Sequence, residues 1–135
     1  MSQTFERRYE NDPRNVALAR GAIADFAVAC GFGPDCIDEI RLAAGEALSN
    51  ASEHGCNGKS GHFGIRCTFD CGELTIDISD NGRGFEPTLV VGASTIPDER
   101  GRGFGMFLMR RLMDSVSFEE CGKRVRLTRR VSRPC

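Results

Sequence analysis

The stretch PDCIDEIRLAAGEALSNASEHG, residues 34–55, has the pattern of a helix with one apolar and one polar side. Its apolar residues recur at spacings of 3, 4, 4 and 3, which is the period of an amphipathic helix. They are Ile37, Ile40, Ala44, Leu48 and Ala51. Pro34 and Asp35 suit the first helical turn, and Gly55 suits the end. The stretch predicts a helix that buries one side in a small domain.

The polar side of this helix carries Glu46 and Asn50, which are one turn apart. At about 100° per residue both side chains project away from the apolar stripe and lie near each other. A carboxylate can take a proton from an alcohol, and an amide oxygen can bind magnesium. The same spacing is common on solvated helices. By itself the pair therefore allows either a solvated face or a ligand-binding face.

A second candidate feature is DNGRGF, residues 80–85, where an alternating strand ends. Gly82 and Gly84 permit positive φ and close approach of the backbone to a ligand. Asp80 stands at the strand end, where its carboxylate could accept a hydrogen bond from an exocyclic amine. Alternatively, these residues could form a simple turn in which the Asp80 side chain is solvated.

A third feature is RGRGFGMFLM, residues 100–109, where three glycines precede a predicted helix. Free backbone N–H groups and the positive end of the helix dipole can hold phosphate there. Arg100 and Arg102 add positive charge. A Rossmann dinucleotide site is disfavoured because no strand comes directly before these glycines, and GCNGKSG, residues 55–61, does not meet the P-loop spacing.

The remaining periodicity predicts helices and strands in one domain spanning 1–135. The expected elements are a strand at 5–9, a helix at 13–30, strands at 64–70 and 73–80, a helix over 106–116 and a hairpin of 115–120 with 124–131. We expect an α+β fold, a two-layer sandwich in which helices cover one face of a mostly antiparallel mixed sheet. The loop 81–105 is far longer than usual, which favours a functional segment.

Composition limits the class of protein. With 135 residues, 40% hydrophobic and 27% charged, the chain fits one globular domain. The absence of a signal sequence and of long apolar runs predicts a cytoplasmic protein. The seven cysteines are odd in number and lack CxxC spacing, which favours reduced thiols over zinc binding. Arg124, Arg126 and Arg130 alternate with apolar residues, so we expect a solvated strand face rather than an anion-binding surface.

Together, the three motifs resemble those of the GHKL (Bergerat-fold) ATP-binding family. Within that family the chain is similar to the small bacterial serine kinase anti-sigma factors, which partner STAS-domain anti-anti-sigma proteins. EALSNASEHG resembles the N box, SDNGRGF the first glycine box and GRGFGMFLMRRLMDSV the second. The resemblance covers about residues 35–131.

The resemblance implies a role for each motif. Glu46 would be the general base that activates a serine hydroxyl, Asn50 would bind Mg²⁺, and Asp80 would hold the adenine amine. A mobile ATP lid would span about 86–104. The rest of the ATP/ADP site would comprise Gly82, Gly84, Phe85, Arg100, Gly101, Arg102, Gly103, Phe104, Gly105 and Met106.

One position departs from the family pattern. Relatives often carry threonine in the last hairpin, near the adenine-binding aspartate. This chain has Lys123 and Arg124 in the matching stretch, and Thr128 stands further along the strand. The resemblance therefore implies an ATP site whose adenine contacts differ from those of its relatives.

The implied function is an ATP-dependent serine kinase that switches between a STAS-domain protein and a sigma factor, with a homodimer as a further expectation. Direct contact with nucleic acid or membrane is not expected. One alternative is a nucleotide-gated binding regulator without kinase activity. Another is the catalytic domain of a histidine kinase, which is disfavoured because only one helix is predicted before Glu46.

Overall fold

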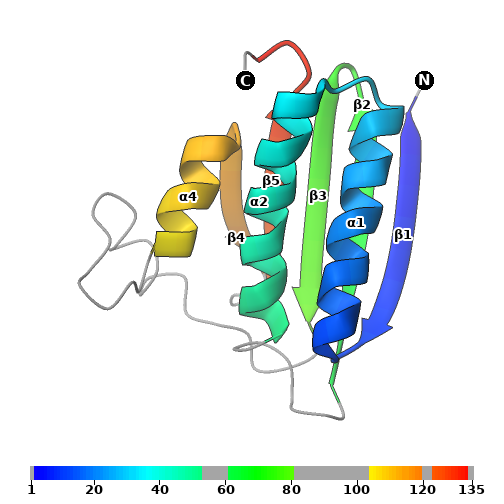
Figure 1. The fold of residues 1–135 in the computed structure, drawn as a ribbon, viewed down its shortest axis with the longest axis vertical. Coiled ribbons are helices and arrows are strands. Elements are labelled where there is room, and N and C mark those ends of the chain that lie inside the picture. The colour runs from blue at the N-terminus through cyan, green and yellow to red at the C-terminus, as the bar shows by residue number, and fades with distance from the viewer. Residues whose placement is uncertain (1, 53–60, 81–103, 120–122, 134–135) are drawn as a thin grey trace.

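The computed structural model describes residues 2–52, 61–80, 104–119 and 123–133, which form two layers (Figure 1). The sheet has the order β1-β2-β3-β5-β4. Its strands are β1 (Gln3–Glu10), β2 (His62–Asp70), β3 (Glu73–Asp80), β4 (Ser115–Glu119) and β5 (Arg124–Arg130). Helices α1 (Pro13–Ala29), α2 (Pro34–Asn50) and α4 (Phe104–Leu112) cover one face. The α+β sandwich is confirmed, although every described strand pair is antiparallel rather than mixed.

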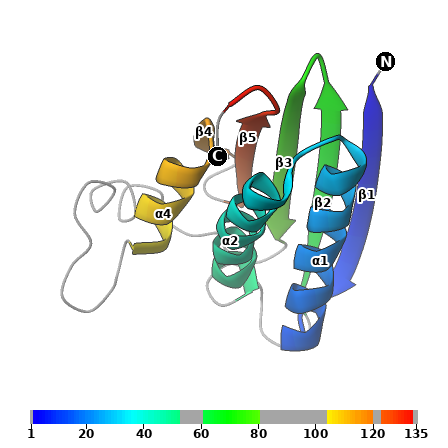
Figure 2. The same cartoon turned by 45° about the horizontal axis from the view of Figure 1, so that its top comes forward.

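The core lies between the helices and the sheet. In β3, alternate residues Leu74, Ile76 and Ile78 are buried and face the helices. The predicted apolar stripe of α2 is buried along its whole length, as expected from its period. Figure 2 shows the three helices side by side on this face, with α2 in the middle. The other face of the sheet, which we call the outer face, has no described helix over it.

The start of α1 matches the cap that the sequence predicts. Asp12 is the N-cap residue and Pro13 is the first helical residue. The carboxylate of Asp12 accepts a hydrogen bond from the backbone N–H of Arg14 at 2.8 Å and forms an ion pair with its guanidinium at 2.9 Å. These contacts with Arg14 lower the pKa of Asp12 from 3.8 to about 2.

This cap predicts a loss of stability in acid. Because the pKa of Asp12 is lower in the folded chain, the stabilisation is complete above about pH 4 and is lost as the pH falls to about 2. We expect Asp12→Ala to lower Tm by a few degrees at pH 7 and to have little effect at pH 2. Asp12→Asn should keep most of the cap without this pH dependence. Thermal unfolding of the three proteins across this pH range measures both effects, and an unchanged Tm for Asp12→Ala at pH 7 would contradict the assignment.

The end of α2 is tied to the segment between β1 and α1. After Asn50 the chain continues in a wider π-type turn through Ala51 and Ser52. Ser52 Oγ donates to Asn11 Oδ1 at 2.6 Å, and Asn11 Nδ2 donates to the Ser52 carbonyl at 3.4 Å. The expected helix end at Gly55 lies outside the described residues. These contacts hold the last turn of α2 in a defined position.

The helix α4 is shorter than the sequence predicts. It ends at Leu112, because the backbone N–H of Asp114 donates to the Thr128 carbonyl at 2.7 Å and the chain enters β4 at Ser115. The predicted apolar side is correct, since Met106, Met109 and Met113 are buried. A short helix leads directly into the edge strand.

The cysteines only partly match the expected reduced state. Cys30, Cys67 and Cys71 are free, whereas Cys36 is disulfide-bonded. The prediction of reduced thiols is therefore wrong for Cys36, because a sequence does not show which thiols meet in space. Burial raises the pKa of the Cys67 thiol to about 12, which makes that thiol unreactive at neutral pH. Cys71 stands in the tight turn between β2 and β3, where its φ is 51°.

Candidate functional site

The described parts of the three motifs lie at one edge of the molecule. In Figure 1, the carboxyl-terminal end of α2, the end of β3 and the start of α4 all point toward the same edge, and Figure 2 agrees. The topology produces this arrangement because α2 and β3 run toward that edge whereas α4 begins there and runs back. Glu46, Asp80 and Gly105 belong to these three ends.

Among the described residues, Glu46 of the first motif lies beside Gly105 of the third. A Cβ atom placed on Gly105 would lie 2.6 Å from Glu46 Oε2 and 3.5 Å from Cδ. Cβ atoms do not approach other atoms within 3.0 Å, so any side chain at position 105 would require this carboxylate to move. The general base implied by the N box thus lies against the first turn of the helix implied to hold phosphate.

Asn50 lies one turn after Glu46 and is half-buried like it. Both residues present oxygen ligands of the kind that Mg²⁺ prefers. The described ranges contain no group of three or more His, Cys, Asp or Glu side chains that could bind a metal by themselves. Magnesium at Asn50 would therefore need further oxygens from phosphate or water, which is usual for Mg²⁺.

Asp80 is the last residue of β3, and it follows the alternation that points Ile76 and Ile78 toward the helices. Its Oδ2 atom is buried, and its backbone N–H donates to the Lys123 carbonyl at 3.0 Å. A buried carboxylate oxygen at a strand end can recognise an amine donor, since it has no competing bulk water. The position fits the role implied for Asp80.

Other site residues expected from the sequence fall outside this description. Gly82, Gly84, Phe85, Arg100, Gly101, Arg102 and Gly103 lie outside the described residues, as does most of the expected lid. Phe104 is the first residue of α4. The Met106 side chain is fully buried in the core, so Met106 could contact a nucleotide only through its backbone.

The strand register shows which residues of the last hairpin lie near Asp80. Arg124 pairs with Ser79, next to Asp80, whereas Thr128 pairs with Thr75. The Thr128 hydroxyl lies 2.5 Å from the Ser115 hydroxyl. Thr128 is thus several residues along the sheet from Asp80.

A groove on the solvent side of α1 and α2 also reaches Glu46. It has a volume of about 310 Å³ and is lined by Arg20, Asp38, Arg41, Leu42, Gly45, Glu46 and Ser49. Leu42 is 49% exposed, and the Arg20 side chain lies over Gly45. The sequence does not predict this groove. The one residue that indicates it is Leu42, an apolar residue on the polar side of α2. Glu46 therefore lies against the start of α4 and also lines a solvent-facing groove.

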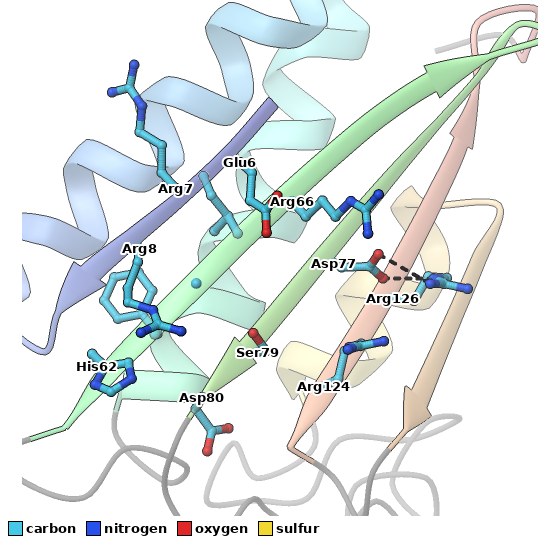
Figure 3. A pocket seen from close by; sticks show the side chains of 13 residues that line it. Glu6, Arg7, Arg8, His62, Arg66, Asp77, Ser79, Asp80, Arg124 and Arg126 are labelled. Atoms are coloured by element: carbon cyan, nitrogen blue, oxygen red, sulfur yellow. Dashed lines mark hydrogen bonds and ion pairs between the residues drawn. The ribbon is translucent and has the colours of Figure 1, made fainter. Parts of the chain in front are cut away.

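A second hollow, of about 430 Å³, lies on the outer face (Figure 3). Across its middle, strand pairing sets Glu6, Arg66, Asp77 and Arg126 in one row of alternating charge. Arg126 Nε donates to Asp77 Oδ1 at 2.7 Å, which raises the pKa of the guanidinium. The partly exposed Arg126 confirms the predicted polar strand face. Glu46 does not line this hollow.

Comparison with known proteins agrees with this geometry. The profile of the family described as histidine kinase-like ATPase domain matches residues 9–129. The chain belongs to this family. An anti-sigma F factor of Clostridium botulinum (strain Eklund 17B / Type B) is 35% identical over 124 residues, covering 87% of each chain. The serine-protein kinase RsbW of Listeria monocytogenes serotype 4a (strain HCC23) is 28% identical over 112 residues, covering 77% of this chain and 71% of that protein.

The fold also matches a solved structure. The crystal structure of the RsbU and RsbW domains of Rv1364c from Mycobacterium tuberculosis aligns with a TM-score of 0.71 at 17% identity. The match covers 98% of this chain and 33% of that longer chain. It supports the two-layer fold of this histidine kinase-like ATPase domain. Among the described helices, none combines the length and apolar character needed to cross a membrane.

Proposed function

We propose that this protein is an ATP-dependent serine kinase and anti-sigma factor, which phosphorylates a STAS-domain anti-anti-sigma protein and alternates between that protein and a sigma factor. Its relatives named anti-sigma F factor and serine-protein kinase RsbW support this proposal. The observation that carries it is the placement of the Glu46 carboxylate against Gly105 in the first turn of α4.

The residues present fit Mg·ATP. Asp80 offers a buried carboxylate oxygen for the adenine amine, and the start of α4 offers the positive end of its helix dipole and its first backbone N–H groups to phosphate. Asn50 offers an amide oxygen to Mg²⁺, which would neutralise phosphate charge during transfer. Phosphoryl transfer depends mainly on such positioning and charge neutralisation.

In this proposal Glu46 accepts the proton of the attacking serine. Its carboxylate meets the phosphate-binding end of α4 on one side and a solvent-facing groove on the other. A base that acts between a nucleotide and a protein substrate must be reachable from both. The serine hydroxyl loses its proton to Glu46 as its oxygen bonds to the γ-phosphorus of ATP, while the bond from that phosphorus to the bridging oxygen breaks and ADP leaves.

A transfer assay tests this function. The protein is incubated with Mg²⁺, γ-labelled ATP and candidate STAS-domain proteins recovered by affinity capture in the presence of ADP and then of ATP. We expect label on one serine of the STAS protein, located by mass spectrometry. No transfer to any captured STAS protein would overturn the kinase assignment. Nucleotide-dependent capture with no phosphorylated product would support the non-catalytic binding regulator instead.

We also propose that the protein forms a homodimer through the outer face. The row Glu6, Arg66, Asp77 and Arg126 is self-complementary about a two-fold axis parallel to the strands. Glu6 would then face Arg126 of the second copy, and Arg66 would face Asp77 of the second copy. Complementary charge of this kind fixes register and suppresses wrong pairings. In the described part of the chain no helix covers this face.

Charge reversal tests the dimer. We expect Asp77→Arg to raise the dimer dissociation constant at least tenfold, because Arg66 would then face a like charge. The double change Arg66→Asp with Asp77→Arg should restore much of the affinity by reversing both charges. Sedimentation equilibrium measures the three proteins. A monomeric wild-type protein at micromolar concentration, or a double variant as weak as the single one, would contradict the proposal.

A further inference from the structure

The buried guanidinium of Arg129 joins three elements of the fold. The Arg129 side chain is 0% exposed. Among the described residues, Arg129 is the one charged residue that is buried. Its Nη1 donates to the carbonyl of Leu112, the last residue of α4. Its Nη2 donates to Glu39 Oε1 of α2 at 2.8 Å and lies 3.4 Å from Cys36 Sγ. Arg129 itself belongs to β5.

These contacts are chemically specific. The last carbonyls of a helix have no partner within the helix and carry its negative dipole end. A guanidinium is the donor best suited to hold such a carbonyl and a carboxylate together, since it presents five N–H donors in a fixed plane. Arg129 thereby connects the carboxyl-terminal end of α4 to the first half of α2.

The two ends of α4 contact α2 in matching register. Leu112 is joined through Arg129 to Glu39, and Gly105 lies against Glu46. On α4, Gly105 and Leu112 are seven residues apart, and on α2, Glu39 and Glu46 are also seven residues apart. Each spacing corresponds to about 10.5 Å at 1.5 Å per residue. The helices are therefore antiparallel, and the position of Leu112 along α2 determines that of Gly105.

The apolar side of α4 does not fix this register as firmly. It consists of Met106 and Met109, followed by Met113, all in the core. Methionine is unbranched and fits many packing arrangements, and apolar contact has no preferred direction. A helix of nine residues is also marginal by itself. Directional hydrogen bonds can hold α4 at one position along its axis. Arg133 Nη2 also donates to the Arg111 carbonyl at 2.8 Å, whereas Arg129 joins the end of α4 to Glu39 of α2.

We propose that Arg129 is a positioning residue for phosphoryl transfer: by holding the carboxyl-terminal end of α4 to Glu39, it keeps the first turn of α4 against Glu46. This inference rests on the proposed kinase function. Arg129 touches neither nucleotide nor substrate in this scheme. Its loss displaces the phosphate-binding turn relative to the base, while Asp80 and its adenine contact on β3 are unaffected.

The test compares Arg129→Met with Arg129→Lys and with the control Arg130→Met. Methionine keeps length without donors, and lysine keeps the charge but not the planar set of donors. Arg130 is the neighbouring arginine, with a side chain 61% exposed and a 3.8 Å ion pair to Glu73. Each protein is assayed well below its Tm, and activity is expressed per mole of folded protein. Hydrogen exchange of the α4 amides is measured without any partner.

For Arg129→Met we expect kcat to fall about tenfold or more, since a misplacement near 1 Å can cost about a hundredfold. KM for ATP should change less than threefold, and amides at the start of α4 should exchange at least tenfold faster. Arg129→Lys should recover part of kcat, and Arg130→Met should match wild type. A residue that only stabilises the fold would lower Tm, leave kcat unchanged and speed exchange of the α4 amides no more than that of the β3 amides, which would overturn the proposal.

The experiment also covers a variant that fails to fold and a wild-type protein that transfers no phosphate. If Arg129→Met fails to fold, Arg129→Lys and Glu39→Gln carry the test, because the Glu39 side chain is 32% exposed and glutamine keeps an oxygen that can accept from Arg129. Both should lower kcat more than KM, and wild-type kinetics in both would overturn the proposal. If the wild-type protein transfers no phosphate, the kinase function fails, whereas unchanged α4 exchange in the variants refutes the positioning role on its own.

Discussion

Glu46→Gln is expected to reduce phosphate transfer by about 10²–10⁴-fold, the usual range for removal of a general base. Glutamine has nearly the shape of glutamate and can still lie beside Gly105. It has no basic oxygen for the serine proton. The structure therefore predicts a loss of kcat with little change in fold or in affinity for ATP.

The control for this change is Asp25→Asn, which neutralises an exposed carboxylate on α1. We expect it to retain wild-type transfer. Single-turnover transfer and calorimetric ATP binding are measured on both variants. If Glu46→Gln transfers phosphate at the wild-type rate, Glu46 is not the base. If it loses ATP affinity to the same extent as kcat, Glu46 acts in nucleotide binding instead.

Periodicity in the sequence was enough to predict the elements that carry the site. The apolar stripe of α2 and the alternation in β2 and β3 were correct because each is set by burial on one side of a regular element. The end of α4 was not predicted. It depends on the hydrogen bond from Asp114 to Thr128, a contact between residues far apart in the sequence.

The contacts that organise the site were less predictable than its residues. Glu46 and Gly105 were both expected in an ATP site, but their direct approach follows from how α4 runs along α2. Arg129 was missed. The strand pattern contained a signal, since position 129 shares the inward side of β5 with Val125 and Leu127, and an arginine there must be buried. Which groups would receive its hydrogen bonds depends on tertiary structure.

Gly105→Ala is expected to separate stability from activity. An added methyl group would lie 2.6 Å from Glu46 Oε2, and the end of a flexible side chain can move away more easily than a backbone. Alanine also favours the helix over glycine by about 0.5–1 kcal/mol. We therefore expect Tm to be equal to wild type or slightly higher. Transfer should fall about a hundredfold, because the carboxylate is displaced from the reacting serine.

The matched control is Gly21→Ala in α1, where an added Cβ would meet no atom within 4 Å. It should gain the same helix stability and keep full transfer. A Gly105→Ala protein with normal kcat would show that the close approach to Glu46 has no catalytic consequence. A large fall in its Tm would instead show that the methyl group disrupts the packing of α4.

The double variant Gly105→Ala with Glu46→Gln decides whether Gly105 acts through Glu46. If the methyl group slows transfer only because it displaces the Glu46 carboxylate, it should not lower the rate further when glutamine already replaces the base. The double variant should then be no slower than Glu46→Gln alone, since effects of residues that act as one unit do not add. Multiplicative losses would mean that the first turn of α4 contributes independently, through its own contact with phosphate. Single-turnover rates of the four proteins in this cycle distinguish these two roles for Gly105.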